Sequence, residues 1–261
     1  MIKKALLSVA GFDPTAGAGV SLDLGAFLHL GFHGTAILTA LTTQNTKLVK
    51  RVHPLQPDFV WDQYKTLFED VHLAGIKVGM IGAKNNVPVI ERILSENPEV
   101  PRVVDPVLQS SSGTWLIEKD AISDYVEKIA IHSSLLTPNL MEATWISEIK
   151  IKKEKDMKRA AEKIHDLIQT PCLIKGGHFP GFTSDLLYDG NRHYFFRNKK
   201  INKNAHGTGC FLSSCILGYL ARGNTVEKAC HQAIELTRQA IQQSVSIGQG
   251  QSVITFPLKE A

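Results

Sequence analysis

One stretch near the end of the chain combines residue types that can bind and transfer a charged group. It reads Asn204-Ala205-His206-Gly207-Thr208-Gly209-Cys210 and runs directly into an apolar segment. The first turn of a helix has backbone N–H groups without internal partners, and the helix dipole adds partial positive charge there. Glycines let a ligand approach, so Gly207, Thr208 and Gly209 suit a phosphoryl group or a developing anion. Cys210 lies on this first turn, where a thiolate is favoured. The alternative is a glycine-rich loop before a buried helix that packs the cysteine as a small apolar side chain.

Four further residues have side chains that phosphoryl transfer requires. The reaction needs cations against the phosphates, a metal held by carboxylates and a group that accepts the hydroxyl proton. Lys175 ends an apolar strand, where a charged side chain must find a partner, and it could meet phosphate oxygens. Asp105, Asn139 and Glu142 offer oxygen ligands that suit Mg²⁺. Each has a structural alternative, because Asp105 could cap a turn, and Asn139 with Glu142 could form a capping box.

Two common nucleotide-binding patterns are missing from the sequence. The Walker A pattern, Gly-x-x-x-x-Gly-Lys-Ser/Thr, does not occur. Gly17-Ala18-Gly19 begins like Gly-x-Gly-x-x-Gly, but Leu22 stands where the third glycine should be. A Rossmann dehydrogenase is therefore not expected.

The segments that must position these residues alternate between strand and helix patterns. Apolar or β-branched runs predict strands at 5–10, 35–43, 75–81, 102–107, 134–136 and 171–175, then a hairpin of 184–188 and 193–196. Apolar residues at helical spacing predict helices at 16–30, 58–71, 87–94, 120–131, 142–149, 154–168, 210–220 and 226–246. This alternation predicts an α/β fold with a mainly parallel central sheet and helices on both faces.

The carboxyl ends of the predicted strands carry polar residues and glycines. They read Gly11-Phe12-Asp13, Thr43-Gln44-Asn45, Gly79-Met80, Asp105-Pro106-Val107, Thr137-Pro138-Asn139 and Lys175-Gly176-Gly177-His178. Ligands of parallel sheets bind beyond such ends, so we expect the site there. The sequence has no internal repeat and no linker rich in Pro, Gly and Ser, which favours one domain over residues 1–261.

The composition limits the classes of protein to consider. The 261 residues are 43% hydrophobic and 21% charged, enough apolar material for a large core. The net charge is +4, and the basic runs at 150–159 and 197–203 are interpreted as solvated faces, so no nucleic-acid partner is expected. We find no signal peptide and no membrane span. The cysteines, Cys172, Cys210, Cys215 and Cys230, form no C-x-x-C pair or zinc spacing, which favours a reduced cytoplasmic setting.

Taken in order, the motifs resemble those of one enzyme family over almost the whole chain. They are Ala10-Gly11-Phe12-Asp13-Pro14, Gly17-Ala18-Gly19-Val20, Leu22-Asp23-Leu24, Thr39-Ala40-Leu41, Gln44-Asn45-Thr46, Lys77-Val78-Gly79-Met80, Val104-Asp105-Pro106-Val107, Leu136-Thr137-Pro138-Asn139 with Glu142-Ala143, Lys175-Gly176-Gly177-His178 and His206-Gly207-Thr208-Gly209-Cys210. The sequence resembles the hydroxymethylpyrimidine/phosphomethylpyrimidine kinases of thiamine biosynthesis, in the ribokinase-like superfamily. The resemblance implies Mg²⁺ with ATP as phosphoryl donor. The expected substrates are 4-amino-5-hydroxymethyl-2-methylpyrimidine and then its monophosphate.

The resemblance also implies how the pyrimidine is bound. Gly11, Met80 and Val107 would surround the ring. Gln44 would hydrogen-bond the ring and its amino group. Asp23 would contact the hydroxymethyl arm.

The remaining roles that the resemblance implies concern ATP and the transferred group. Asp105, Asn139 and Glu142 would organise Mg²⁺ and the phosphates, with Asp105 and Glu142 as the metal ligands. Lys175 would stabilise the transferred phosphoryl group. The turn of Gly207, Thr208 and Gly209 would form the anion hole. Cys210 would take the place of the catalytic base, which is usually Asp elsewhere in the superfamily.

The chain departs from the family pattern in places. The chain has Asp105-Pro106-Val107-Leu108-Gln109-Ser110-Ser111-Ser112-Gly113 where the family tends to read Asp-Pro-Val-Met-Val-Ala, then Lys or Thr, then Ser-Gly. This segment resembles a flexible lid whose serines could bond phosphate oxygens. Phe12 and Ala16 replace Ser/Thr and Gly, and Gly25 replaces a frequent Lys.

Two alternatives to the pyrimidine kinase stay open. A pyridoxal/pyridoxine kinase would use a similar ring with a hydroxymethyl arm, but Gln44 and the 206–210 motif favour the pyrimidine. A non-catalytic pyrimidine-binding sensor is disfavoured by the retained Lys175, Asp105 and Glu142. Superfamily members often dimerise, so a homodimer is also considered.

Overall fold

The computed structural model describes residues 4–110, 113–177 and 182–256. Nine of its strands form one sheet in the order β3-β2-β1-β4-β5-β6-β7-β8-β9. The strands are β1 (Ala5–Phe12), β2 (His33–Gln44), β3 (Val49–Pro54), β4 (Leu73–Val78), β5 (Arg102–Val104), β6 (Leu135–Leu136), β7 (Cys172–Ile174), β8 (Phe182–Tyr188) and β9 (His193–Lys199). Neighbouring strands are parallel along the central part of this order, β2-β1-β4-β5-β6-β7. At one edge β3 pairs antiparallel with β2, and at the other edge β8 and β9 extend the sheet antiparallel. The expected mainly parallel sheet is confirmed.

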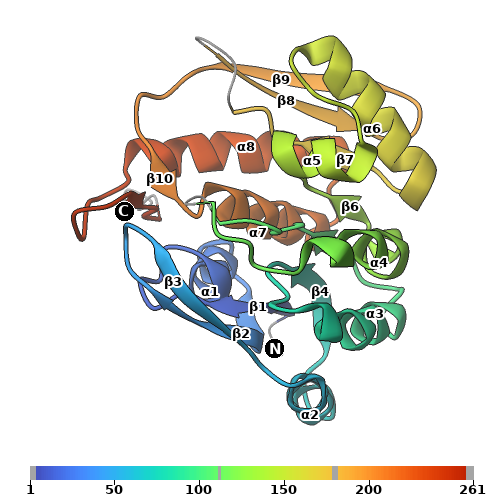
Figure 1. Ribbon diagram of the computed structural model, residues 1–261, viewed down its shortest axis with the longest axis vertical. Helices are drawn as coiled ribbons and strands as arrows, with labels where there is room; N and C mark the ends of the chain where they lie inside the picture. Colours follow the sequence, from blue (N-terminus) through green and yellow to red (C-terminus); the bar gives the residue numbers. More distant parts are fainter. Residues whose placement is uncertain (1–3, 111–112, 178–181, 257–261) are drawn as a thin grey trace.

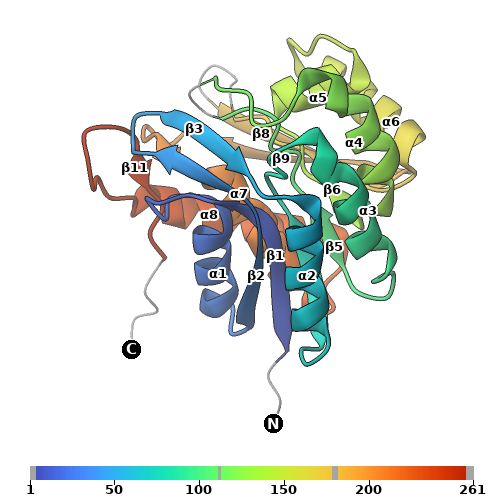
Figure 2. The same ribbon diagram turned by 60° about the horizontal axis from the view of Figure 1, so that its bottom comes forward.

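Helices cover both faces of this sheet, as expected (Figures 1 and 2). They are α1 (Gly19–His29), α2 (Pro57–Phe68), α3 (Val87–Ser95), α4 (Ile122–Lys128), α5 (Leu140–Ser147), α6 (Glu154–Ile168), α7 (Thr208–Ala221) and α8 (Val226–Gln242), with short 3-10 turns η1 (Lys84–Asn86), η2 (Lys119–Ala121) and η3 (Ala130–His132). One core cluster joins the sheet to α2–α6, and a second joins it to α1, α7 and α8. Neighbouring strand residues point to opposite faces, so Leu7 enters the first core and Leu6 the second.

Local sequence explains where several of these helices begin and end. Pro57 stands at the start of α2, where its missing N–H costs no hydrogen bond. Gly31, at φ 80°, follows α1 and permits the chain to turn into β2. Charged residues face solvent along α6, while Met157 and Ile164 are fully buried, which is the expected amphipathic pattern.

The structure also differs from the sequence-based expectation at several elements. The edge strand β3 was not expected, nor was the small parallel pair of β10 (Ala205–His206) and β11 (Ser252–Val253). The helix expected at 120–131 is divided into η2, α4 and η3. In the segment that resembles a lid, Gln109 Nε2 donates to the Gly113 carbonyl at 2.8 Å. Ser111, Ser112 and His178 lie outside the described residues.

Among the described helices, none has both the length and the apolar character needed to cross a membrane. All four cysteines are unpaired thiols.

Candidate active site

A cavity of about 670 Å³ lies at the carboxyl ends of the parallel strands. This is the edge at which open α/β sheets bind their ligands. With one exception, the residues expected at the site line this cavity, namely Gly11, Gln44, Met80, Asp105, Val107, Asn139, Glu142, Lys175, Gly207, Thr208, Gly209 and Cys210. The exception is Asp23.

The backbone of the first turn of α7 forms one wall of the cavity. Gly207 precedes the helix at φ 81° and ψ 7°, and no side chain caps this end. A Cβ atom on Gly207 would lie 1.8 Å from the carbonyl oxygen of Gly17, so only glycine fits. A Cβ atom on Gly209 would lie 3.1 Å from Lys175 Nζ. The helix turn and the lysine therefore face the same space and can bind the same anion.

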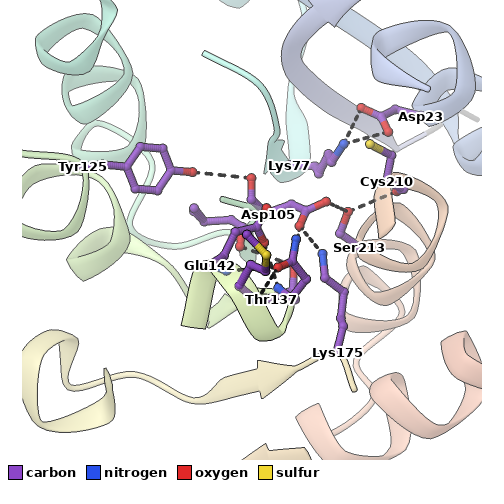
Figure 3. A network of polar contacts seen from close by, with 12 residues as sticks. Asp23, Lys77, Asp105, Tyr125, Thr137, Glu142, Lys175, Cys210 and Ser213 are labelled. Atoms are coloured by element: carbon purple, nitrogen blue, oxygen red, sulfur yellow. Dashed lines mark hydrogen bonds and ion pairs between the residues drawn. The ribbon is translucent and has the colours of Figure 1, made fainter. Parts of the chain in front are cut away.

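Asp105 and Lys175 form an ion pair beside this turn (Figure 3). Lys175 Nζ donates to Asp105 Oδ1 at 2.6 Å, and the hydroxyls of Thr137 and Ser213 each donate to this carboxylate at 3.2 Å. Burial lowers the pKa of Lys175, but attraction to Asp105 and Glu142 outweighs it and raises the pKa above its ordinary value. Lys175 is therefore a cation at neutral pH. The Asp105 carboxylate lines the cavity and is held by Lys175, Thr137 and Ser213, so its role is not confined to capping a turn.

Asn139 and Glu142 form the capping box of α5 and still line the cavity. Asn139 Oδ1 accepts the N–H groups of Met141 and Glu142 at 2.9 and 3.0 Å, and Glu142 Oε2 accepts the Asn139 N–H at 2.7 Å. Glu142 is 3% exposed. Burial, with a smaller contribution from Asp105, raises the pKa of Glu142 to about 8 despite the opposing charge of Lys175. Burial therefore favours the protonated form of this carboxyl group.

Cys210 lines the cavity from the first turn of α7, and its sulfur lies on the side of Lys77 and Asp23 (Figure 3). Burial raises the pKa of its thiol, and the charges of Asp105 and Asp23 add to the rise. The Lys77 ammonium and the Gly19 backbone N–H oppose this rise without cancelling it. This direction runs against the expected preference for a thiolate, because desolvation favours the neutral thiol.

The expectation that Asp23 contacts the substrate is corrected by its surroundings. Its side chain is 0% exposed, and Lys77, equally buried, donates to both carboxylate oxygens at 2.8 Å. Ser8 and Ser214 donate to the same carboxylate at 2.6 and 2.8 Å. The carboxylate is saturated beneath the cavity floor, where it holds Lys77. Attraction to Asp23 raises the pKa of Lys77 although burial lowers it, so this lysine stays charged.

An apolar patch lies elsewhere on the cavity wall. Val107 packs against a small cluster of Ala40, Met80 and Leu116. A Cβ atom on Gly11 would lie 3.2 Å from Met80 Sδ, so a glycine at this position leaves room for the methionine. The patch can receive a small apolar ring.

Sequence reasoning missed several residues of the site. Lys77 lines the cavity, and its signal was a charged residue inside an apolar strand, the same signal that identified Lys175. Thr137 and Ser213 were not singled out because hydroxyl residues carry no distinctive spacing. Asp13 and His206 stood inside the motifs without an assigned role, and they contact each other at 3.0 Å.

Solved structures of two kinases share this architecture along nearly their whole length. The ADP complex of Bacillus subtilis pyridoxal kinase matches with a TM-score of 0.89 and 27% identity, covering 98% of both chains. Phosphomethylpyrimidine kinase from Clostridium difficile matches with a TM-score of 0.81 and 33% identity, covering 92% of this chain and 100% of that one. The fold is that of the ribokinase-like kinases, enzymes that transfer a phosphoryl group from ATP.

The sequence narrows this class to one family. The family model described as phosphomethylpyrimidine kinase matches residues 13–255. The hydroxymethylpyrimidine/phosphomethylpyrimidine kinase of Aquifex aeolicus is 38% identical over 252 residues, which cover 96% of this chain and 99% of that protein. The chain belongs to the phosphomethylpyrimidine kinase family.

Proposed function

We propose that this protein phosphorylates 4-amino-5-hydroxymethyl-2-methylpyrimidine with ATP, and then phosphorylates the monophosphate to the diphosphate used for thiamine diphosphate. One observation carries the proposal: Lys175, Asp105 and the 207–210 turn converge on a cavity that also holds an apolar patch and Gln44. Membership of the phosphomethylpyrimidine kinase family supports it. In this proposal residues 1–261 act as one kinase domain.

The pyrimidine ring binds against the apolar patch. Gly11, Met80 and Val107 contact its faces, and Gln44 hydrogen-bonds its edge. A few polar groups in a mostly apolar pocket are enough to fix the orientation of a small ring. This arrangement leaves the hydroxymethyl arm directed toward the 207–210 turn.

The phosphoryl group is transferred at that turn. The hydroxymethyl oxygen forms a bond to the γ-phosphorus of ATP, the bond from this phosphorus to the β–γ bridging oxygen breaks, and ADP leaves with the electron pair. Lys175 and the N–H groups of Gly207, Thr208 and Gly209 stabilise the charge on the equatorial oxygens. Such preorganised donors act most strongly in a water-excluded site.

Asp105 and Glu142 fit a magnesium site, with the Asn139 side chain as a further oxygen donor. Both carboxyl groups face one cavity, and kinase sites bind Mg²⁺ through one or two carboxylates together with phosphates and waters. When bound, the ion neutralises charge on the ATP phosphates. An approaching cation also favours the ionised form of Glu142, which burial disfavours.

Cys210 is the candidate for the base that accepts the hydroxyl proton. Its raised pKa keeps the thiol protonated near neutral pH, so the active thiolate is a minor form that grows with pH. A positioned base contributes about 10²–10⁴-fold. Cys210→Ser, Cys210→Ala and Cys210→Asp variants test this role through their pH–rate profiles.

Mass-spectrometric product analysis with Mg-ATP tests the proposed activity. We expect both the mono- and the diphosphate of the aminopyrimidine, together with ADP. A single phosphate would limit the proposal to the first step. Absence of both products and of ADP would contradict it and favour the pyrimidine-binding sensor.

Pyridoxal kinase is the second candidate, because the B. subtilis pyridoxal kinase has the same fold at 27% identity. Values of kcat/KM for pyridoxal and for the aminopyrimidine, measured side by side, separate the two. A large preference for pyridoxal would overturn our choice.

The proposal also covers the cellular compartment and the oligomeric state of the enzyme. Four unpaired thiols support a reducing, cytoplasmic compartment. Members of the superfamily often dimerise, so a homodimer is proposed, and sedimentation analysis tests it.

A further inference from the structure

Three side chains from distant parts of the chain meet at the rim of the cavity. Asp13 follows β1, Gln44 ends β2, and His206 belongs to β10. His206 Nε2 lies 3.0 Å from Asp13 Oδ2 and 3.1 Å from the side-chain nitrogen Nε2 of Gln44. One ring nitrogen therefore contacts both a carboxylate and an amide.

Asp13 is held firmly as an acceptor. Its side chain is 4% exposed, and Oδ1 accepts both the backbone N–H and the hydroxyl of Thr15 at 2.9 Å. Burial alone would raise the pKa of Asp13, but hydrogen bonds from His206 and Thr15 lower it below its ordinary value. A carboxylate has no proton to donate, so the His206 nitrogen that faces it must carry the hydrogen.

The imidazole ring has little freedom to turn away from this contact. His206 pairs with Val253 through the backbone of β10 and β11. A Cβ atom on Gly17 would lie 2.8 Å from His206 Cδ2, so the ring packs directly on the loop backbone. The hydrogen on Nε2 is needed whether or not the other ring nitrogen is also protonated.

This proton decides which end of the Gln44 amide faces the histidine. An Nε2–H group has no lone pair to accept an amide hydrogen, so the Gln44 carbonyl oxygen must face it. The structure places Gln44 Nε2 toward His206 and Oε1 3.2 Å from Thr42 Oγ1, but the two ends of an amide are assigned from their partners. With the amide turned by 180°, its NH₂ group faces Thr42 Oγ1, which donates its own hydrogen to the Phe12 carbonyl at 3.0 Å and can accept one from the amide. Every donor in this chain then has an acceptor, whereas the opposite amide orientation sets two donors against each other.

We propose that Asp13, acting through His206, fixes the Gln44 amide so that its free N–H faces the cavity and binds an acceptor nitrogen of the substrate ring. Asp13 and His206 are positioning residues in this proposal, which rests on the proposed function for the identity of the ring. Pyrimidine ring nitrogens carry lone pairs, so they match an N–H donor and repel a carbonyl oxygen. The three residues therefore set specificity at the ring edge.

The tautomer of His206 is measured first, since this measurement does not depend on turnover. Long-range ¹H–¹⁵N spectra should show hydrogen on Nε2 in the wild-type protein and a shift away from this form in Asp13→Asn, whose amide can donate to the ring. His165 is the internal control, because its Nδ1 faces the Thr170 carbonyl at 2.9 Å and should keep its own tautomer in both proteins. A wild-type His206 with hydrogen only on Nδ1 would overturn the proposal.

Steady-state kinetics then test whether the orientation of the Gln44 amide affects binding of the substrate. We expect Asp13→Asn and His206→Leu to raise the KM for the aminopyrimidine about tenfold, as for a lost hydrogen bond, with little change in the KM for ATP. His206→Gln, which keeps an N–H donor at the end of the side chain, should recover much of the loss. Asp120→Asn makes the same chemical change at a surface carboxylate paired with Lys84 and should alter neither constant.

A double-mutant cycle separates positioning from general damage. In a Gln44→Ala background, Asp13→Asn should change the KM for the aminopyrimidine by less than about twofold, because its effect passes through the missing amide. Additive losses, or equal losses in the KM for ATP, would refute the positioning role. A wild-type enzyme that makes no pyrimidine phosphate would instead contradict the proposed function, and the tautomer measurement would still decide the inference.

Discussion

Replacement of Asp23 by Asn should damage stability, not substrate affinity. The variant keeps the shape of the side chain but removes the charge that faces Lys77, and both side chains are 0% exposed. Removing one partner of a buried ion pair costs about 3–5 kcal/mol, because the other charge is left uncompensated. In a domain of this size each kcal/mol corresponds to about 2–4 °C, so Tm should fall by about 6–20 °C.

A second substitution should restore the balance of charge in the core. Lys77→Met removes the ammonium that the single variant leaves unpaired, so the double variant should regain much of the lost stability, as replaced buried pairs often do. Urea unfolding and thermal scans measure the difference. Asp120→Asn is the control, because its surface pair with Lys84 should contribute no more than about 1 kcal/mol.

The kinetic constants supply the result that would refute this reasoning. If Asp23 acts only through Lys77, the folded fraction of Asp23→Asn at low temperature should bind the aminopyrimidine with a near-normal KM. A variant that unfolds like the wild type but shows a strongly raised KM would mean that Asp23 contacts the substrate after all.

Three further predictions concern the phosphoryl-transfer wall of the cavity. Lys175→Met should lower kcat by about 10²–10³-fold with little change in the KM for the aminopyrimidine, and an unchanged kcat would exclude Lys175 from the transfer step. The rate should rise with pH as the Cys210 thiol ionises toward its raised pKa, and this rise should disappear in Cys210→Ala, whose unchanged kcat would contradict the base role. Gly207→Ala should abolish activity and lower Tm, because the new Cβ atom would lie 1.8 Å from the Gly17 oxygen. Gly223→Ala has a similar φ of 85° with no atom within 4 Å, so equal losses in both variants would assign the effect to backbone strain alone.

Short-range patterns were sufficient for most of the fold. The helix expected at 154–168 is α6 (Glu154–Ile168), since apolar residues recur every three or four positions among charged ones along the whole segment. The edge strand β3 reads Val-Lys-Arg-Val-His-Pro and has no fully buried residue, so it lacks the apolar signal that buried strands have. The strands β10 and β11 are two residues each, too short for any periodicity.

Most residues of the candidate site could be predicted from the sequence, but not all of their contacts could. Motif order placed Asp105, Lys175 and the 207–210 turn at one edge of the sheet, and they do meet there. The same motifs could not distinguish a carboxylate that faces the cavity from one that lies beneath it, which is why Asp23 was misassigned. That distinction depends on Lys77, 54 residues away along the chain.

The contact between Asp13 and His206 joins positions 193 residues apart, and the Gly207 turn closes against Gly17 over a similar span. Such contacts form only after most of the intervening chain has been ordered, because loop closure must come before the contact can stabilise anything. We therefore expect catalytic competence to be a late event in folding, behind the central sheet and its first helices. In a refolding experiment followed at the same time by far-ultraviolet circular dichroism and by ADP formation, the spectroscopic signal should recover before enzyme activity does. For a chain made from its amino end on the ribosome, β1 is made long before the 207–210 turn, so the active site can be assembled around this strand only after that turn has been made.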